Sequence, residues 1–460
     1  MKHHAATLLL LLALCATDSG AQATAPVEPE ATAAAADSLR EDVQEVVERV
    51  ERIRGGKSPV TLQASRASTE TREAMVESVV TNQITRAQLD ARGRAWSDLG
   101  LGDKEAPLRI LRLLTADLEV VTLDSGGTRL LVSQDVLVDR VVVSDQPDDP
   151  SSALLLATGV RPDEPLIAHM AVHVLQRSRE RSQSHAARTT DAILARSAWA
   201  EGEANLVAIG MLFQGLRLAD AVLQPGIDPA EVLGGRLVPA GIAASPPPDR
   251  VFLEFVYQEG YEEAIRVFRG GGFRALEQAA HVRATTRDLI HPDRSPLGPP
   301  EFPPGTPPGD ADRPYRLADE DSLGEQGVFA LVSQRTGKDD LALAAADGWR
   351  FDRLSRWDPA AAAPAGLVGV TVWETFWGSD EDASEFAYAA GRVIEDGFGG
   401  VAAQADPANR KSWSTADRTF RLSRTGRAIV LRVASIADDS FLEGPRKNAV
   451  PATSTKKLKK

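Results

Sequence analysis

Cysteine is almost absent from this 460-residue sequence, and long apolar runs are confined to its first residues. The single cysteine, Cys15, directly follows the apolar stretch from Ala5 to Leu14. Once that part of the chain is removed no thiol remains, so disulfides cannot hold the fold together. No later apolar run reaches the roughly 20 residues that a membrane-spanning helix needs. The sequence therefore predicts a mature protein with no disulfide and no transmembrane segment.

The first 23 residues are typical of a secretory signal peptide. A basic start is followed by the apolar stretch and then by the small-residue motif Ala21-Gln-Ala23. Leu14 precedes Cys15 at the position where a lipoprotein cleavage site needs a small residue. We therefore expect cleavage after Ala23 and a secreted or periplasmic protein. Residues 24–36 are rich in Ala, Pro and Glu, and we expect them to form a flexible tether.

The chain is strongly acidic. Its formal net charge is −13, although its C-terminal end is basic. We expect residues 436–460 to be a disordered basic tail. An acidic body argues against nucleic acid as a partner. The basic residues of the tail are Arg446, Lys447, Lys456, Lys457, Lys459 and Lys460.

The order of the expected elements is that of an α+β protein. A mainly helical body spans residues 37–298, a proline-rich linker or loop spans 299–312, and a smaller α+β part spans 313–435. A strand, turn and strand at 118–133 precede the histidine-containing helix around residue 169. Further helices are expected at 37–53, 68–80, 85–99, 189–216, 252–269, 273–282, 322–335 and 380–395, with strands at 366–376 and a strand pair at 418–433.

The segment His169-Met170-Ala171-Val172-His173 is the strongest functional signal. Two histidines four residues apart lie on one face of a helix, which is the spacing that lets both bind one zinc ion. With seven histidines in the chain, such a pair arises by chance with a probability of roughly 0.1, so a third ligand is needed as support. A metallopeptidase has Glu after the first histidine, where this chain has Met170.

The third zinc ligand is expected on the next helix. Glu201 and Glu203 both lie there among Ala, Leu and Val, where an unpaired buried carboxylate would be costly. Helical periodicity places Glu201 with Leu194 and Ala198, and it places Glu203 on another face with Val207. Periodicity alone does not choose between the two glutamates.

These residues resemble a family of bacterial exported zinc metallopeptidases of the HExxH, gluzincin-like type. In that family an HExxH-A-L-Q-D-Q helix is followed by an A-L-x-E-G-E/D-A-T helix. The resemblance extends over about residues 40–435. Its matching segments are His169, His173, Val174-Leu175-Gln176, Ala200-Glu201-Gly202-Glu203-Ala204-Asn205, Phe255-Val-Tyr-Gln-Glu-Gly260, Gly271-Gly272-Phe273, Thr285-Thr286, Ile290-His291-Pro292, Asp321-Ser-Leu-Gly-Glu325, Gly348-Trp349, Trp373 and Asp382-Ala-Ser-Glu-Phe386.

The resemblance implies a zincin-like body in which His169, His173 and Glu201 bind zinc. It also implies that an extended peptide would add as a strand along the hairpin from Leu118 to Leu131. Two departures matter. Met170 replaces the catalytic Glu, so no catalytic residue is assigned, and Arg177-Ser178 replaces the D-Q pair that follows the helix.

We therefore expect an exported pseudopeptidase that binds a polypeptide or supports an envelope complex, with zinc as its cofactor. An active zinc peptidase with a displaced general base is the alternative. A third hypothesis is that the protein no longer binds zinc and that His169, His173 and Glu201 form a hydrogen-bonded cluster in the core. His291 either lines the cleft or caps a helix end, and Trp349, Trp373 and Trp377 are expected to be core anchors.

Overall fold

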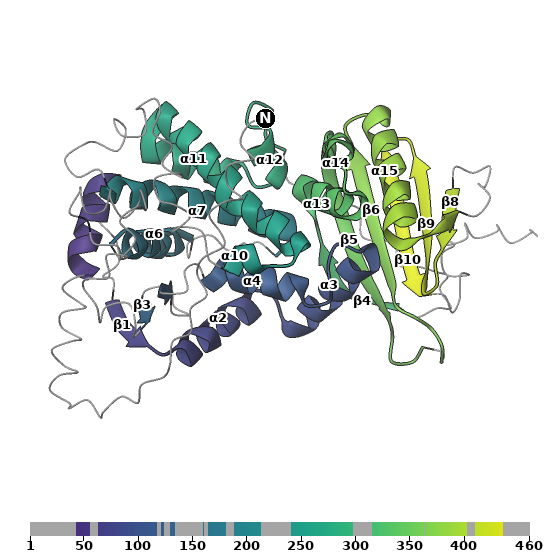
Figure 1. The fold of residues 1–460 in the computed structure, drawn as a ribbon, viewed down its shortest axis with the longest axis horizontal. Coiled ribbons are helices and arrows are strands. Elements are labelled where there is room, and N and C mark those ends of the chain that lie inside the picture. Colours follow the sequence, from purple (N-terminus) through teal and green to yellow (C-terminus); the bar gives the residue numbers. More distant parts are fainter. Residues whose placement is uncertain are drawn as a thin grey trace, which may run out of the picture.

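The computed structural model describes residues 43–55, 63–116, 121–123, 129–133, 160, 164–180, 188–212, 241–297, 315–363, 365–402 and 410–435. The predicted signal peptide (1–23), tether (24–36), proline-rich linker (299–312) and basic tail (436–460) lie outside these residues. The fold is α+β, as predicted. A mainly helical part lies beside a C-terminal sheet that carries its own helices (Figure 1). Within the described chain, no helix is long and apolar enough to cross a membrane.

The helical part follows the predicted order, with three helices that the sequence analysis missed. Residues 43–54 are helical and end at Gly55, whose φ of 77° favours glycine. The missed helices are α4, which lies between α3 and the hairpin, and the two short helices α10 and α12. The bounds are α2 (Thr69–Gln83), α3 (Arg86–Leu99), α4 (Ala106–Ala116), α6 (Glu164–Glu180), α7 (Thr190–Leu212), α10 (Gly241–Ala244), α11 (Pro247–Val282) and α12 (Thr286–Ile290).

Local signals explain where several helices begin and end. Thr85 and Gln88 form a capping box at the start of α3, and Gly100 ends it with a φ of 80°. The two helices predicted on either side of the triple glycine are confirmed. They share the label α11 but meet at a kink, with non-helical backbone at Gly271 and Gly272. Gly272 has a φ of 65°, a conformation that favours glycine.

The small sheet of the helical part corrects one prediction. The expected hairpin exists as β2 (Val121–Leu123) and β3 (Arg129–Ser133), which pair antiparallel. A strand that the sequence analysis missed, β1 (Gln63–Ala67), pairs parallel with β3, so the sheet order is β1-β3-β2. Because β3 is the central strand, it cannot receive an added peptide strand. Of the hairpin strands, only β2 lies at an edge.

The C-terminal part is a seven-stranded sheet in the order β4-β5-β6-β10-β9-β8-β7. Each neighbouring pair is antiparallel. The strands are β4 (Tyr315–Asp321), β5 (Trp349–Pro359), β6 (Val370–Trp377), β7 (Val401–Ala402), β8 (Arg410–Ser414), β9 (Arg418–Thr425) and β10 (Ala428–Ser435), and the helices are α13 (Gly324–Thr336), α14 (Asp339–Ala346) and α15 (Asp380–Phe398).

The helices of this part cover one face of the sheet (Figure 1). Trp373 and Trp377 on β6 contact Phe386 on α15, with ring centroids 5.3 and 4.7 Å apart. Trp349, Trp373, Trp377 and Phe386 are all at most 2% exposed, which confirms the prediction that they are core anchors. One apolar cluster continues from these residues to Trp96 on α3 in the helical part.

Buried polar contacts join the helical part to β4. The Arg92 guanidinium on α3 pairs with Asp319 at 3.0 Å. The Thr190 backbone N–H and hydroxyl at the start of α7 both donate to Asp321, at 2.6 and 2.7 Å. Since these side chains are at most 8% exposed, breaking one partner would leave a buried polar group without its bond.

Asp191, in the first turn of α7, makes the stability of this junction depend on pH. Burial is the main cause that raises its pKa to about 7, with a smaller contribution from the nearby Asp352 carboxylate. Its Oδ1 accepts bonds from the backbone N–H and the hydroxyl of Thr286 at 2.9 and 2.6 Å. The folded state therefore holds the Asp191 proton more tightly than the unfolded chain does.

We expect the free energy of unfolding to fall as pH rises from about 4 to 7, because the unfolded chain releases the Asp191 proton first. The contribution of this one group is roughly 2 to 4 kcal/mol. Urea unfolding at pH 5 and pH 8 measures it. Asp191→Asn should remove this pH dependence and be more stable than wild type at pH 8, whereas the exposed Asp340→Asn should change neither. Equal pH dependence in wild type and Asp191→Asn would contradict the assignment.

Candidate metal centre

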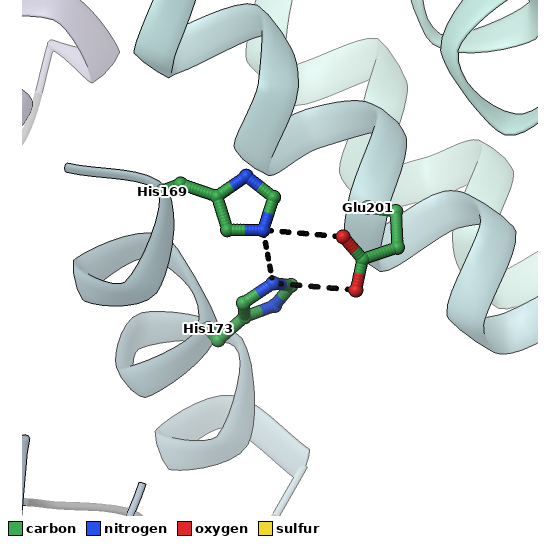
Figure 2. A group of neighbouring side chains, drawn as sticks. All are labelled: His169, His173 and Glu201. Atoms are coloured by element: carbon green, nitrogen blue, oxygen red, sulfur yellow. Dashed lines mark hydrogen bonds and ion pairs between the residues drawn. The ribbon is translucent and has the colours of Figure 1, made fainter. Parts of the chain in front are cut away.

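Helices α6 and α7 bring the three predicted ligands together. His169 and His173 lie one turn apart on α6, and Glu201 on α7 faces both imidazoles (Figure 2). The His169 Nε2 and His173 Nε2 atoms are 3.0 Å apart. Glu201 Oε2 lies 3.1 Å from His169 Nε2, and Glu201 Oε1 lies 3.4 Å from His173 Nε2. The sequence prediction that these side chains converge is confirmed, while their role as ligands stays a prediction.

The spacing of the cluster is that of a possible metal centre. Zinc bonds of about 2.0 to 2.2 Å place neighbouring ligand atoms about 3.3 Å apart in a tetrahedron. The two imidazole Nε2 atoms are 3.0 Å apart and a different oxygen of Glu201 lies near each of them, so that one ligand atom from each residue lies within 4.8 Å of the other two. Glu201 Oε2 is buried and accepts no hydrogen bond of good geometry. A cation between the three side chains would satisfy this carboxylate oxygen.

Burial and the neighbouring charges set the protonation states in the cluster. Burial lowers the pKa of His169, and Glu201 opposes this only in part. Burial alone would raise the pKa of Glu201, but the close approach of the His173 and His169 imidazoles holds that pKa well below its usual range. A neutral His169 and an ionised Glu201 are the forms that bind zinc.

Gln176 orients His173 from the next turn of α6. Its amide nitrogen donates to the Ala200 carbonyl at 3.1 Å and to Glu203 Oε2 at 2.8 Å. The amide oxygen therefore faces His173 Nδ1 at 2.8 Å and can only accept from it. The proton of His173 then sits on Nδ1, which leaves the lone pair of Nε2 directed at the cluster.

Asn205 is a functional candidate that the sequence analysis did not assign. It lies one turn after Glu201 on α7 and interacts with His169, whose pKa it raises. His169 Nδ1 and Asn205 Oδ1 are both buried, and neither has a hydrogen-bond partner among the described residues. A proton on Nδ1 would pair these atoms and leave the His169 Nε2 lone pair free for a metal. The four-residue spacing from Glu201 was the available signal.

Close packing of α7 on α11 holds Glu201 in place. A Cβ atom on Gly202 would lie 2.2 Å from the Gly260 carbonyl oxygen, and a Cβ on Gly260 would lie 2.3 Å from the Ala198 carbonyl oxygen. Any larger residue at either position would push the two helices apart. The glycine between Glu201 and Glu203 therefore lets α7 approach α11, and this fixes which glutamate faces the histidines.

Glu203 points to a different set of partners. Its carboxylate forms a buried salt bridge with Arg54 from the helix at 43–54 and accepts the bond from Gln176. Arg54 also lies 3.4 Å from Glu277 and 5.5 Å from the centre of the Phe273 ring. Glu203 therefore helps to position Gln176 beside His173, and its own charge is paired with the Arg54 guanidinium.

Met170 lies in an apolar core. Its side chain is fully buried in a cluster that joins the helix at 43–54, β3, α6 and α7. Neighbours in this cluster include Val43, Leu130, Val174 and Val207. A carboxylate at this position would lose its hydration without gaining a partner from these side chains.

A second group of possible ligands lies between α12 and the C-terminal part. His291 caps the C-terminal end of α12 through its backbone N–H group, which is one of the two roles predicted for it from the sequence. Its Nε2 atom lies 2.6 Å from Glu325 Oε1. Asp347 completes the group but pairs with Arg294 at 2.6 Å. Positive charge from Arg287 also acts on Glu325, so this group is better described as an ion-pair network than as a metal centre.

Comparison with known proteins found a match for the C-terminal sheet but none for the residues of the candidate metal centre. Residues 313–442 match a family described as a domain of unknown function (DUF8575). No curated protein and no solved structure matches the chain. The match includes β4 through β10, whereas His169, His173 and Glu201 lie outside it.

Proposed function

We propose that this chain is an exported, metallopeptidase-like protein that binds zinc through His169, His173 and Glu201 and binds polypeptide without cleaving it. The observation that carries the proposal is the convergence of one ligand atom from each of these three side chains within 4.8 Å, beside a methionine at the position of the general base. Asn205 and Gln176 would orient the two imidazoles toward the ion.

The proposal separates metal binding from catalysis. Bound zinc supplies a Lewis acid and lowers the pKa of its water, but hydrolysis also needs a base that passes a proton to the leaving amine. Met170 cannot take up or release a proton. Glu203 is held by Arg54 and Gln176, which argues against it as a displaced base. These contacts favour the pseudopeptidase over the alternative of an active zinc peptidase.

The β2 strand is the edge at which a polypeptide would add. Among the described strands, β3 pairs with one side of β2 and no strand pairs with its other side. An extended peptide gains backbone hydrogen bonds at such an edge. Since β2 contacts α6, the peptide would lie beside the helix that carries both histidines.

We expect no zinc-dependent cleavage of an unfolded, casein-like substrate by the purified mature protein. Met170→Glu should not create activity, and it should lower the free energy of unfolding by about 2 to 4 kcal/mol because it places a carboxylate in an apolar cluster. Met170→Leu is the matched control and should stay within about 1.5 kcal/mol of wild type. Chelator-sensitive proteolysis by the wild type, at a rate typical of metallopeptidases, would establish the active-peptidase alternative instead.

Binding of the same unfolded substrate, labelled for fluorescence anisotropy, tests the other half of the proposal. We expect saturable binding to wild type. Val121→Pro and Thr122→Pro each remove one N–H group of β2, and in an antiparallel strand one of two consecutive N–H groups faces outward. Loss of the N–H group that bonds to β3 should lower the melting temperature, whereas loss of the outward N–H group should not. The proline variant with an unchanged melting temperature has therefore lost the outward N–H group, and it should bind the substrate more weakly than wild type does. Unchanged binding by that variant would exclude the β2 edge.

A further inference from the structure

The face of the C-terminal sheet opposite its helices carries a row of arginines. Leu422 on β9 and Leu431 on β10 belong to the core on the helix side. Because side chains alternate along a strand, Arg421 and Arg432 project from the opposite face. They are direct cross-strand partners in the β9–β10 register.

A third arginine lies next to this pair. Arg421 is also the partner of Ser412 on β8, and Arg410 is the partner of Ser423, two residues further along β9. Directly opposite side chains have Cβ atoms about 5 Å apart, and diagonal ones are about 7 to 8 Å apart. Three guanidinium groups from three strands therefore gather in one place.

The charge of these arginines is not balanced by neighbouring carboxylates. Among the described residues, Arg410, Arg421 and Arg432 form no salt bridge, and the Nε atoms of Arg421 and Arg432 are buried without a hydrogen-bond partner. Glu374 acts on Arg432, but it is already bound by Arg353 at 2.8 Å. Burial and the two neighbouring arginines lower the pKa of Arg432. Like charges in direct cross-strand positions destabilise a sheet, so an anion bound between these arginines would stabilise it.

We propose that Arg410, Arg421 and Arg432, with the Ser412 hydroxyl, form a binding site for a phosphate group. Three guanidinium forks offer more N–H donors than the two oxygens of a carboxylate can accept, whereas a tetrahedral dianion can accept from all of them. The phosphate is either a free ion or the head group of an anionic phospholipid. This site is independent of the metal centre, and its test does not depend on zinc.

Thermal unfolding of the full mature chain, in potassium phosphate and in potassium chloride of equal ionic strength, tests the site. We expect phosphate to raise the melting temperature of wild type more than that of the Arg421→Gln/Arg432→Gln double variant. Arg250→Gln, at an exposed arginine on α11, is the matched control and should keep the full response. The general stabilising effect of phosphate acts equally on all three proteins and cancels in the comparison.

The same experiment in chloride checks the repulsion between the arginines. We expect the double variant to be at least as stable as wild type there, because it relieves the like-charge contact. Vesicles that contain phosphatidic acid, whose head group is a phosphomonoester, identify a head-group ligand when wild type binds them and not neutral vesicles, and when the double variant binds at least tenfold more weakly. Two results would overturn the proposal. The first is an equal shift of the melting temperature by phosphate in wild type and double variant, together with equal binding to vesicles. The second is a double variant that is less stable than wild type in chloride.

Discussion

Glu201→Gln is expected to abolish tight zinc binding, and wild type is expected to hold one zinc ion per chain. Structural zinc sites with four ligands contribute about 10 to 16 kcal/mol, so one ligand is worth roughly 3 kcal/mol, which corresponds to more than a hundredfold in affinity. Replacing the carboxylate removes both a ligand and the one negative charge of the cluster. Metal analysis after dialysis, followed by competition with a zinc chelator, measures stoichiometry and affinity.

The variants around the site should fall into two classes. His169→Ala and His173→Ala should behave like Glu201→Gln, whereas Gln176→Ala and Asn205→Ala should weaken binding by about 10- to 100-fold because they only orient the imidazoles. His281→Gln, at an exposed histidine on α11, is the control and should bind zinc as wild type does. The opposite outcome is a wild type that holds no zinc and variants whose only change is in the melting temperature. That outcome would establish the third interpretation, a hydrogen-bonded cluster without metal.

Asp352→Ala is expected to cause the largest loss of stability in the C-terminal part, on the order of 4 to 5 kcal/mol. The Asp352 side chain on β5 is 1% exposed and accepts five hydrogen bonds. Its donors are the Ser322 hydroxyl at 2.8 Å, the Leu323 and Gly324 backbone N–H groups at 2.9 and 3.0 Å, and the Trp349 and Trp373 indoles at 3.2 and 2.8 Å.

The size of this loss follows from the number of donors left without a partner. Each buried donor without an acceptor costs about 1 to 3 kcal/mol, and local relaxation recovers part of the total. Asp352→Asn keeps one carbonyl oxygen and should cost less than Asp352→Ala. Urea unfolding measures the free energies, and the exposed Asp340→Ala serves as control. A difference below about 1 kcal/mol between Asp352→Ala and this control would contradict the account.

Several helices and the pairing of two histidines could be predicted because their signals are local. Thr85, Gln88 and Gly100 lie within one turn of the ends of α3, and they act on backbone groups of that same helix. His169 and His173 share a helix face through spacing alone. The burial of Trp373 could be predicted from its place in an apolar strand, because a large aromatic side chain is stabilised when a neighbouring layer covers it.

The strand order depended on contacts that no local pattern contains. β1 is 62 residues or more from its partner β3, and their parallel register pairs Gln63 with Arg129. The sequence analysis missed β1, β4, β5, β7 and β8. Of these, β1, β4 and β5 are each stabilised by a distant strand, and propensity in strands reflects that context. The edge of the small sheet was therefore assigned to the whole hairpin when only β2 occupies it.

The sequence by itself determined that two histidines lie on one helix face, that methionine follows the first of them, and that two glutamates lie on the next helix. Helical periodicity did not choose between these glutamates and the family resemblance favoured Glu201, but only the tertiary structure places the Glu201 carboxylate against both imidazoles. Gly202 and Gly260 let α7 approach α11, and Arg54 with Gln176 binds the carboxylate of Glu203. The physical reason is that α7 is apolar around most of its surface, so its periodicity has no preferred face and the packing of its neighbours sets its rotation.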